Sequence, residues 1–186
     1  AGQSGSEVGK AINFLQNFQW DQVKVVVISA VQRVVPPDSR LFRQNLPLAD
    51  AAAAIIVARF PMPFIRNFRV LSVVSSQSEN GQDPGLNNIF QRVVEKAKIS
   101  SRSIKWSILH SLNRELENSV HADLPETTWL SRRSNQTVDF GCADVLVSLQ
   151  QLSLNNSILC DGIGVLWFYG RFGAIIAVSV DSRPLS

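Results

Sequence analysis

Ile163-Gly-Val-Leu-Trp-Phe-Tyr-Gly-Arg-Phe-Gly-Ala-Ile-Ile-Ala-Val-Ser-Val180 is made of two apolar runs around a short break. The runs 163–169 and 174–180 are joined by Gly170-Arg171-Phe172-Gly173, whose glycines supply the backbone angles that a tight connection needs. We therefore predict a β-hairpin at about 163–180. A membrane span over 162–180 is the alternative, but it would hold Arg171 at the bilayer centre at a cost of about 2.5 to 3.5 kcal/mol.

Upstream of this hairpin, apolar residues recur at the three-to-four spacing of one helical face. The spacing predicts helices at 6–18, capped by Ser6, and at 21–34, although the β-branched run 25–28 would equally suit a buried strand. Further helices are predicted at 47–59, 86–97 and 101–120, and one after Asp139. For 64–74 a helix and a strand alternating Phe68, Val70, Ser72 and Val74 both remain open.

These segments predict a mainly α fold, a single-domain helical bundle with a C-terminal β-hairpin, with α+β as the alternative. A chain of 186 residues that is 45% hydrophobic suits one core. We expect a flexible segment at 1–5 and one domain over 6–186, with the polar loop 75–85 as the only plausible internal boundary. The 47–59 helix is apolar nearly all round and is expected at the centre of the core.

The positive charge of the chain is concentrated in the segment 40–69. The formal net charge is +3, and this segment holds five arginines against one acid, Asp50. Arginine alternates there with phenylalanine, and guanidinium groups suit phosphates while rings suit bases. The alternative is that the rings belong to the core and the arginines to solvent. The predicted nucleic-acid-binding residues are Arg40, Arg43, Arg59, Arg66 and Arg69, extended by the exposed pair Arg132 and Arg133.

Residues that could carry catalysis or bind a metal show no diagnostic motif. His110 and His121 would lie about 16 Å apart on an unbroken helix, too far to share a metal. Cys142 and Cys160 match neither a redox pair nor a zinc knuckle, so buried free thiols are expected, with one disulfide as the alternative. No phosphate-binding glycine loop is present, and Asp144 is spaced as a surface residue would be. We expect no cofactor and no metal, and an enzyme has no specific support.

Composition completes the functional hypothesis. Arginine is preferred to lysine, and Ser, Asn and Gln are abundant beside a hydrophobic excess that partner subunits would bury. We therefore predict a non-enzymatic, RNA-binding structural protein of the capsid or viral nucleoprotein kind, a homo-oligomer, with a membrane role not expected. An intracellular or virion location is favoured over secretion. The alternatives are a protein-interaction module with an apolar C-terminal docking segment, or a membrane-associated protein.

Overall fold

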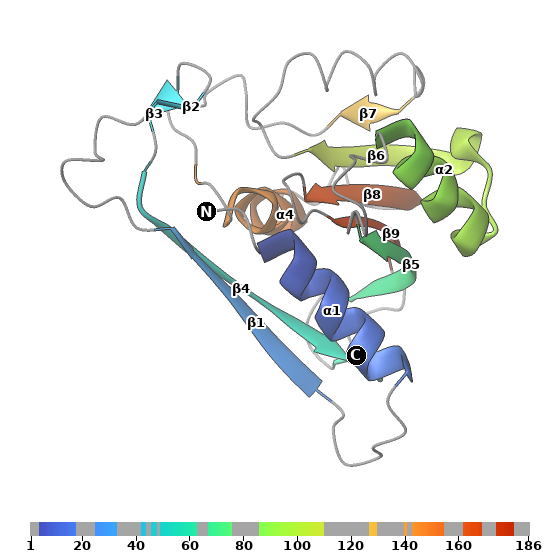
Figure 1. Cartoon of the computed structure of the whole chain (residues 1–186), viewed down its shortest axis with the longest axis horizontal. Helices are drawn as coiled ribbons and strands as arrows, with labels where there is room; N and C mark the ends of the chain where they lie inside the picture. Colours follow the sequence, from blue (N-terminus) through green and yellow to red (C-terminus); the bar gives the residue numbers. More distant parts are fainter. Residues whose placement is uncertain are drawn as a thin grey trace, which may run out of the picture.

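A computed structural model describes residues 4–17, 25–32, 42–43, 46–47, 49–62, 67–75, 86–109, 127–129, 140, 143–154, 162–168 and 174–180. Within these ranges the chain is a mixed α/β protein, so the predicted helical bundle is wrong (Figure 1). The strands and helices in order are α1 (Ser4–Asn17), β1 (Val25–Gln32), β2 (Phe42–Arg43), β3 (Leu46–Pro47), β4 (Ala51–Ala58), β5 (Phe68–Ser75), α2 (Leu86–Ala97), β6 (Ile104–Leu109), β7 (Thr128–Trp129), α4 (Asp144–Leu154), β8 (Ile163–Phe168) and β9 (Ala174–Val180).

The larger sheet has five strands in the order β5-β9-β8-β6-β7. The strands β6, β7 and β8 run parallel to one another, and β9 runs antiparallel to both of its neighbours, β8 and β5. The β8–β9 pair, with Ile163 opposite Ser179 and Phe168 opposite Ala174, confirms the predicted C-terminal hairpin. Its connection at 169–173 lies outside the described residues. This hairpin is the centre of the sheet, with strands on both sides.

The second sheet pairs β1 with β4, in an antiparallel register that runs from Val25 opposite Ala58 to Gln32 opposite Ala51. The helices predicted at 21–34 and 47–59 are therefore wrong, and the strand alternative for the β-branched run is confirmed. Pairing overrides the helix propensity of the alanine run, because every second residue of β4 then packs toward the core while the others face outward. The expected central helix is instead one strand of a two-stranded sheet.

The segment after α2 also differs from the prediction. Ser100 accepts a hydrogen bond from the backbone N–H of Arg102 and caps a short 3₁₀ turn, Ser101–Ser103, after which the chain extends as β6. The alternating residues Ile104, Trp106 and Ile108 are each at most 1% exposed. The helix predicted over 101–120 is therefore wrong at its start, and its remainder lies outside the described residues. The undecided segment 64–74 holds a strand, β5.

Three helices were predicted correctly, and they cover the sheets in layers. The helices α1 and α4 lie between the two sheets, and α2 lies on the other face of the larger sheet (Figure 1). α1 begins at Ser4, so Ser6 stands inside the helix and is not its cap. None of the helices that the structure describes is long and apolar enough to cross a membrane.

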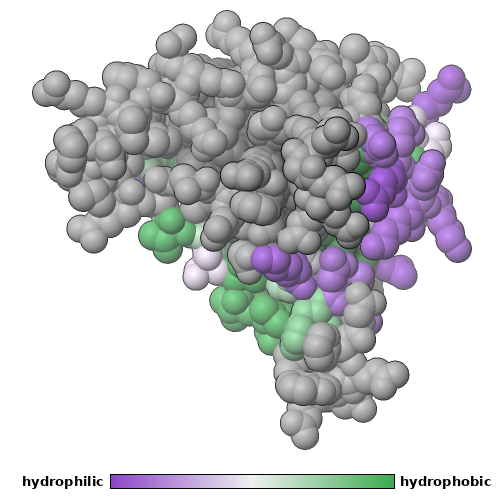
Figure 2. All heavy atoms as spheres, in the orientation of Figure 1, coloured by the Kyte–Doolittle hydropathy of each residue, from purple (hydrophilic) through white to green (hydrophobic). Residues whose placement is uncertain are grey.

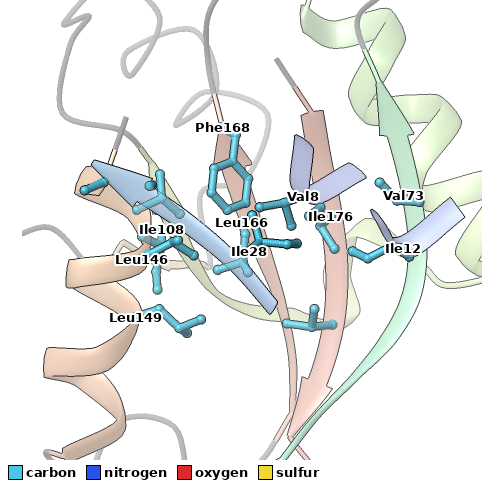
Figure 3. Close-up of a cluster of buried hydrophobic side chains, with 14 of the residues drawn as sticks. Val8, Ile12, Ile28, Val73, Ile108, Leu146, Leu149, Leu166, Phe168 and Ile176 are labelled. Carbon is cyan, nitrogen blue, oxygen red and sulfur yellow. The ribbon is translucent and has the colours of Figure 1, made fainter. Parts of the chain in front are cut away.

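Two apolar clusters hold these layers together. The inner cluster joins α1 and α4 to facing sides of both sheets, and Figure 3 shows Val8, Ile28, Leu146 and Leu166 converging from four different elements. The outer cluster packs α2 on the larger sheet through Phe90, whose ring stacks on Trp167 at a centroid distance of 5.3 Å. The larger sheet is thus buried on both faces, as parallel strands require.

Candidate functional site

The carboxyl ends of three strands define one edge of the larger sheet. Since β6, β7 and β8 are parallel, their last residues, Leu109, Trp129 and Phe168, lie toward the same edge. In open α/β sheets ligands bind outside the carboxyl ends of the strands. α4 follows β7 in the chain and packs against β6 and β8 through the inner cluster. We take this edge, together with the start of α4, as the candidate active site.

The start of α4 is deeply buried. The backbone N–H of Ala143 donates to the carbonyl of Phe140 at 3.1 Å, which closes a turn just before the helix. Ala143 is 0% and Asp144 is 1% exposed, and the Asp144 carboxylate lies in the first turn, where the helix dipole favours negative charge. An acidic group is therefore held within the protein at the beginning of a helix.

This carboxylate is a site residue that sequence reasoning missed, because Asp144 was predicted to lie at the surface. The sequence around Asp144 was the signal that could have indicated its burial. Its chain neighbours Ala143, Val145 and Leu146 are all buried, as is Ser148 one turn later. A helix that is apolar on more than one face is a buried helix, and its polar residues are buried with it.

A hydrogen-bonded pair of side chains holds the strands behind this edge. The indole N–H of Trp167 donates to the Ser107 hydroxyl at 2.5 Å, and that hydroxyl donates to the Val165 carbonyl at 3.3 Å. All three residues are at most 1% exposed. The polar atoms of Ser107 and Trp167 are thus satisfied across β6 and β8, which fixes these two strands relative to each other.

The packing of Trp106 against Gly164 adds a second restraint on the same strands. The two residues are register partners, and the indole ring occupies the space that a β-carbon on Gly164 would take. Phe68 meets the same ring edge-on, with centroids 6.3 Å apart. Trp106 Nε1 has no hydrogen-bond partner in the part of the chain that the structure describes.

The structure describes three of the seven predicted arginines. Arg59 directly follows β4 of the smaller sheet, and Arg69 belongs to β5 of the larger one; both are exposed. Arg43 is paired with Leu46 in the short β2–β3 ladder. These three lie on different sheets, and Arg40, Arg66, Arg132 and Arg133 lie outside the described residues. A role for the arginines in binding an anion stays a prediction.

The sulfur and imidazole groups considered from the sequence also lie outside the described residues. This applies to His110, His121, Cys142 and Cys160. In the ranges that the structure does describe, no group of three His, Cys, Asp or Glu side chains is placed to hold a metal ion. The described part of the candidate site therefore offers a buried carboxylate at a helix start.

No protein-family model and no curated protein matches this chain. Solved structures do match. An acyltransferase named ChlB3 is 16% identical with a TM-score of 0.67, over 96% of this chain and 64% of that one. The 3-oxoacyl-[acyl-carrier-protein] synthase III of Aquifex aeolicus is 14% identical with a TM-score of 0.65, over 97% of this chain and 65% of that one. The ishigamide ketosynthase/chain length factor matches at 12% identity and a TM-score of 0.67, over 96% and 54%.

These similarities define the class of fold, which is the thiolase-like fold of ketosynthases. The chain spans less than two thirds of the length of these three proteins. At such low identity the likeness shows the fold alone.

The predicted RNA-binding capsid or nucleoprotein is corrected by this finding. It rested on composition alone, whereas the similar structures are biosynthetic acyltransferases and ketosynthases. The nucleic-acid partner predicted for the arginines, and the self-assembling coat predicted from the hydrophobic excess, are corrected with it. The hydrophobic excess has a different physical reason, because the larger sheet is covered on both faces and needs apolar residues on both.

Proposed function

We propose that this chain is part of an acyl-condensing enzyme, which takes an acyl group from a thioester on a carrier and transfers it to a second molecule. One observation carries the proposal: the five-stranded sheet with α4 behind its parallel strands matches acyltransferases and 3-oxoacyl synthases over 96% or more of the chain. The substrate class is taken from those proteins, one of which is named for its acyl-carrier protein.

Acyl transfer from a thioester requires a nucleophile and a base. In this chain we expect both at the carboxyl edge of the larger sheet. A cysteine thiolate attacks the thioester carbonyl, the carrier thiolate leaves and takes up a proton, and the acyl group stays on the cysteine sulfur. The sequence supplies both groups next to described residues. His110 directly follows Leu109, the last residue of β6, in the sequence, and Cys142 directly precedes Ala143.

Chain connectivity limits how far these two groups can be from the site. Consecutive Cα atoms are about 3.8 Å apart, so His110 begins one step beyond the end of β6. Cys142 is likewise one residue from Ala143 and two from the first residue of α4, Asp144. The positive end of a helix dipole favours a thiolate. We assign Cys142 as the nucleophile and His110 as the base.

Arg59 and Arg69 are two of the exposed cations that the structure describes. Both are exposed, and the protein carries a net charge of +3. Exposed charges of this kind raise the association rate with an oppositely charged partner and lose that effect in salt. Their proposed role is to attract the carrier, and Cys142 and His110 perform the transfer.

Intact-protein mass spectrometry after incubation with a short-chain acyl thioester tests the proposal. We expect the mass of one acyl group on the wild-type chain and none on Cys142→Ser, while Cys160→Ser, the matched control, is acylated as the wild type is. His110→Ala should slow acylation at least 100-fold, in keeping with the loss of a general base. Absence of acylation in the wild type would refute the proposed function, and undiminished acylation of Cys142→Ser would refute the assignment of the nucleophile.

A further inference from the structure

Five exposed cations lie at the end of α2 and in the segment that follows it. The segment 91–105 contains these five cations and one acid, Glu95, so its formal charge is +4, whereas the whole chain carries +3. We call the five exposed side chains the basic surface. Its residues are Arg92, Lys96, Lys98, Arg102 and Lys105.

The fold places the basic surface at the edge of the larger sheet opposite the candidate active site. The short segment 98–103 joins α2 to β6, so the end of α2 lies at the edge where β6 and β8 begin (Figure 1). Figure 2 shows hydrophilic residues gathered at that end of the molecule. The Lys105 side chain lies there beside Gly162, since a β-carbon on Gly162 would be 2.8 Å from Lys105 Cγ. Each of these strands has 6 residues, so about 20 Å separates this edge from the candidate active site.

Two backbone hydrogen bonds end α2 in a Schellman motif. The N–H of Ile99 donates to the carbonyl of Val94 at 3.2 Å, and the N–H of Lys98 donates to the carbonyl of Glu95 at 3.0 Å. Ile99 also packs against the outer cluster, to which Val94 belongs. Lys98 therefore occupies the position after the helix cap, where glycine is the usual residue.

Lys98 holds a backbone conformation that a side chain disfavours. Its φ of 55° is in the left-handed region, and among the described residues other than glycine it alone has a positive φ. A β-carbon in this conformation lies too close to the following carbonyl oxygen, so lysine costs stability here that glycine would not. Backbone strain of this kind occurs mostly at functional positions. The side chain of Lys98 is therefore a candidate for a function outside the fold.

Stabilisation of the helix accounts for only part of the basic surface. A cation in the last turn of a helix interacts favourably with its carbonyl end, and Lys96 lies in that turn of α2. The effect falls off beyond the last turn, whereas Arg102 lies in the 3₁₀ turn and Lys105 in β6. Neither of these two side chains forms an ion pair with a described residue. Their charges are available to a partner.

The chemistry of the basic surface fits an acidic protein segment better than an anionic membrane. In the described ranges the exposed large apolar side chains belong to β1, β4 and Phe60, so the basic surface has none to insert into lipid. Glu95 is exposed among the cations and repels a uniformly negative layer. A protein segment can instead place carboxylates opposite the cations and a neutral residue opposite Glu95.

We propose that the basic surface is a docking site for an acidic segment of a partner protein, whose carboxylates pair with Lys98, Arg102 and Lys105. Exposed ion pairs are weak one by one and are screened by salt, so binding requires several pairs together and weakens as salt is added. Because the surface lies at the edge opposite the candidate active site, this partner is not the molecule that delivers the acyl group. The inference goes beyond the proposed function and does not depend on it.

Fluorescence anisotropy at low salt, with a labelled peptide of alternating glutamate and serine, tests the proposal. We expect the wild-type chain to bind this peptide and not the matching peptide of lysine and serine. Arg102→Glu should weaken binding by about tenfold, because it removes one attraction and adds one repulsion. Lys10→Glu, on α1, is the matched control. It changes the net charge by the same amount and should bind within about twofold of the wild type, because charges far from the contact are screened.

Lys98→Gly separates docking from folding stability. The substitution removes both the backbone strain and one cation, so the midpoint of urea unfolding should rise while affinity for the acidic peptide falls by about threefold. Unchanged affinity would overturn the role given to Lys98. Cys142→Ser should bind the peptide as the wild type does, whether or not the acyl chemistry is correct.

Three results would overturn the proposal as a whole. The first is no binding of the acidic peptide to the wild-type chain. The second is an equal loss of binding in Lys10→Glu and Arg102→Glu, which would show a response to net charge alone. The third is binding to phosphatidylserine vesicles that Arg102→Glu abolishes and that the acidic peptide does not displace, which would assign the basic surface to a membrane.

Discussion

Gly164→Ala tests the register of the two central parallel strands. Gly164 of β8 stands opposite Trp106 of β6, and a β-carbon added to it would overlap the six-membered ring of the indole. Trp106 is 1% exposed and its ring meets that of Phe68 edge-on, so the ring is enclosed by the core. We expect overpacking to destabilise the fold.

The size of the effect follows from two opposing terms. Overpacking a well-packed core costs about 1 to 3 kcal/mol, and the rigid indole places this site near the upper value. Replacing glycine by alanine also lowers the conformational entropy of the unfolded chain, which stabilises the folded state by about 0.4 to 1 kcal/mol. The expected net loss in the free energy of unfolding is about 2 kcal/mol. Urea unfolding measures it as a midpoint lowered by about 1 M for a typical slope.

A double-mutant cycle with Trp106→Leu separates this contact from other causes. Trp106→Leu is itself destabilising, but it vacates the space that the new methyl group needs. Gly164→Ala should then cost nothing further, so the coupling energy should be about 2 kcal/mol. If Gly164→Ala stays within 0.5 kcal/mol of the wild type, or if the two changes are additive, β6 and β8 do not meet in this register.

Three further substitutions test other parts of the structure by urea unfolding. Ile28→Ala should cost about 2 to 5 kcal/mol, because this side chain is in the inner cluster, while Val27→Ala next to it should change stability by less than 0.5 kcal/mol; equal effects would contradict the orientation of β1. Ser107→Ala should cost about 1 to 3 kcal/mol, since it leaves the buried Trp167 N–H without its acceptor, and an unchanged midpoint would exclude that hydrogen bond. Phe90→Ala should cost about 3 to 5 kcal/mol by removing the ring stacked on Trp167, and a loss below 1 kcal/mol would show that α2 does not pack there.

The elements predicted correctly from the sequence are those in which the spacing of apolar residues fits only a helix or only a strand. α2 carries apolar residues at helical spacing and exposed Arg92 and Lys96 on the other side, so its period is unambiguous. The C-terminal hairpin was predictable because its two apolar runs are too short for helices and are separated by glycines. In both cases the local sequence contains the information that the fold uses.

The strands β1, β4 and β6 were predicted as helices because their burial depends on distant partners. An alanine run has no period that distinguishes helix from strand, and β4 becomes a strand only through pairing with β1. In β6, Ile104 and Ile108 fit a helical spacing as well as a strand, and the parallel partner β8 lies far along the chain. Pairing between segments that are remote in sequence cannot be read from the period of either one.

The candidate site was hidden from the sequence for a related reason. Asp144 resembles a solvent-exposed residue until the helix that begins with it is known to be buried. The carboxyl edge of the sheet exists only once β6, β7 and β8 are known to be parallel. Charge was a poor guide, because the described arginines of the prominent segment are divided among three sheets, with Arg43 in β2, Arg59 after β4 and Arg69 in β5.

The strand order of the larger sheet has a consequence for biosynthesis. The strands β8 and β9 leave the ribosome after the other strands of this sheet, while the strands that flank them, β5 and β6, are made much earlier. Until the C-terminal hairpin emerges, β5 and β6 have no partner between them and Phe90 of α2 has no Trp167 to stack on. A nascent chain in this state exposes strand edges and apolar side chains, the features that chaperones bind. Folding of this sheet therefore ends with the insertion of its C-terminal hairpin between strands that were made earlier.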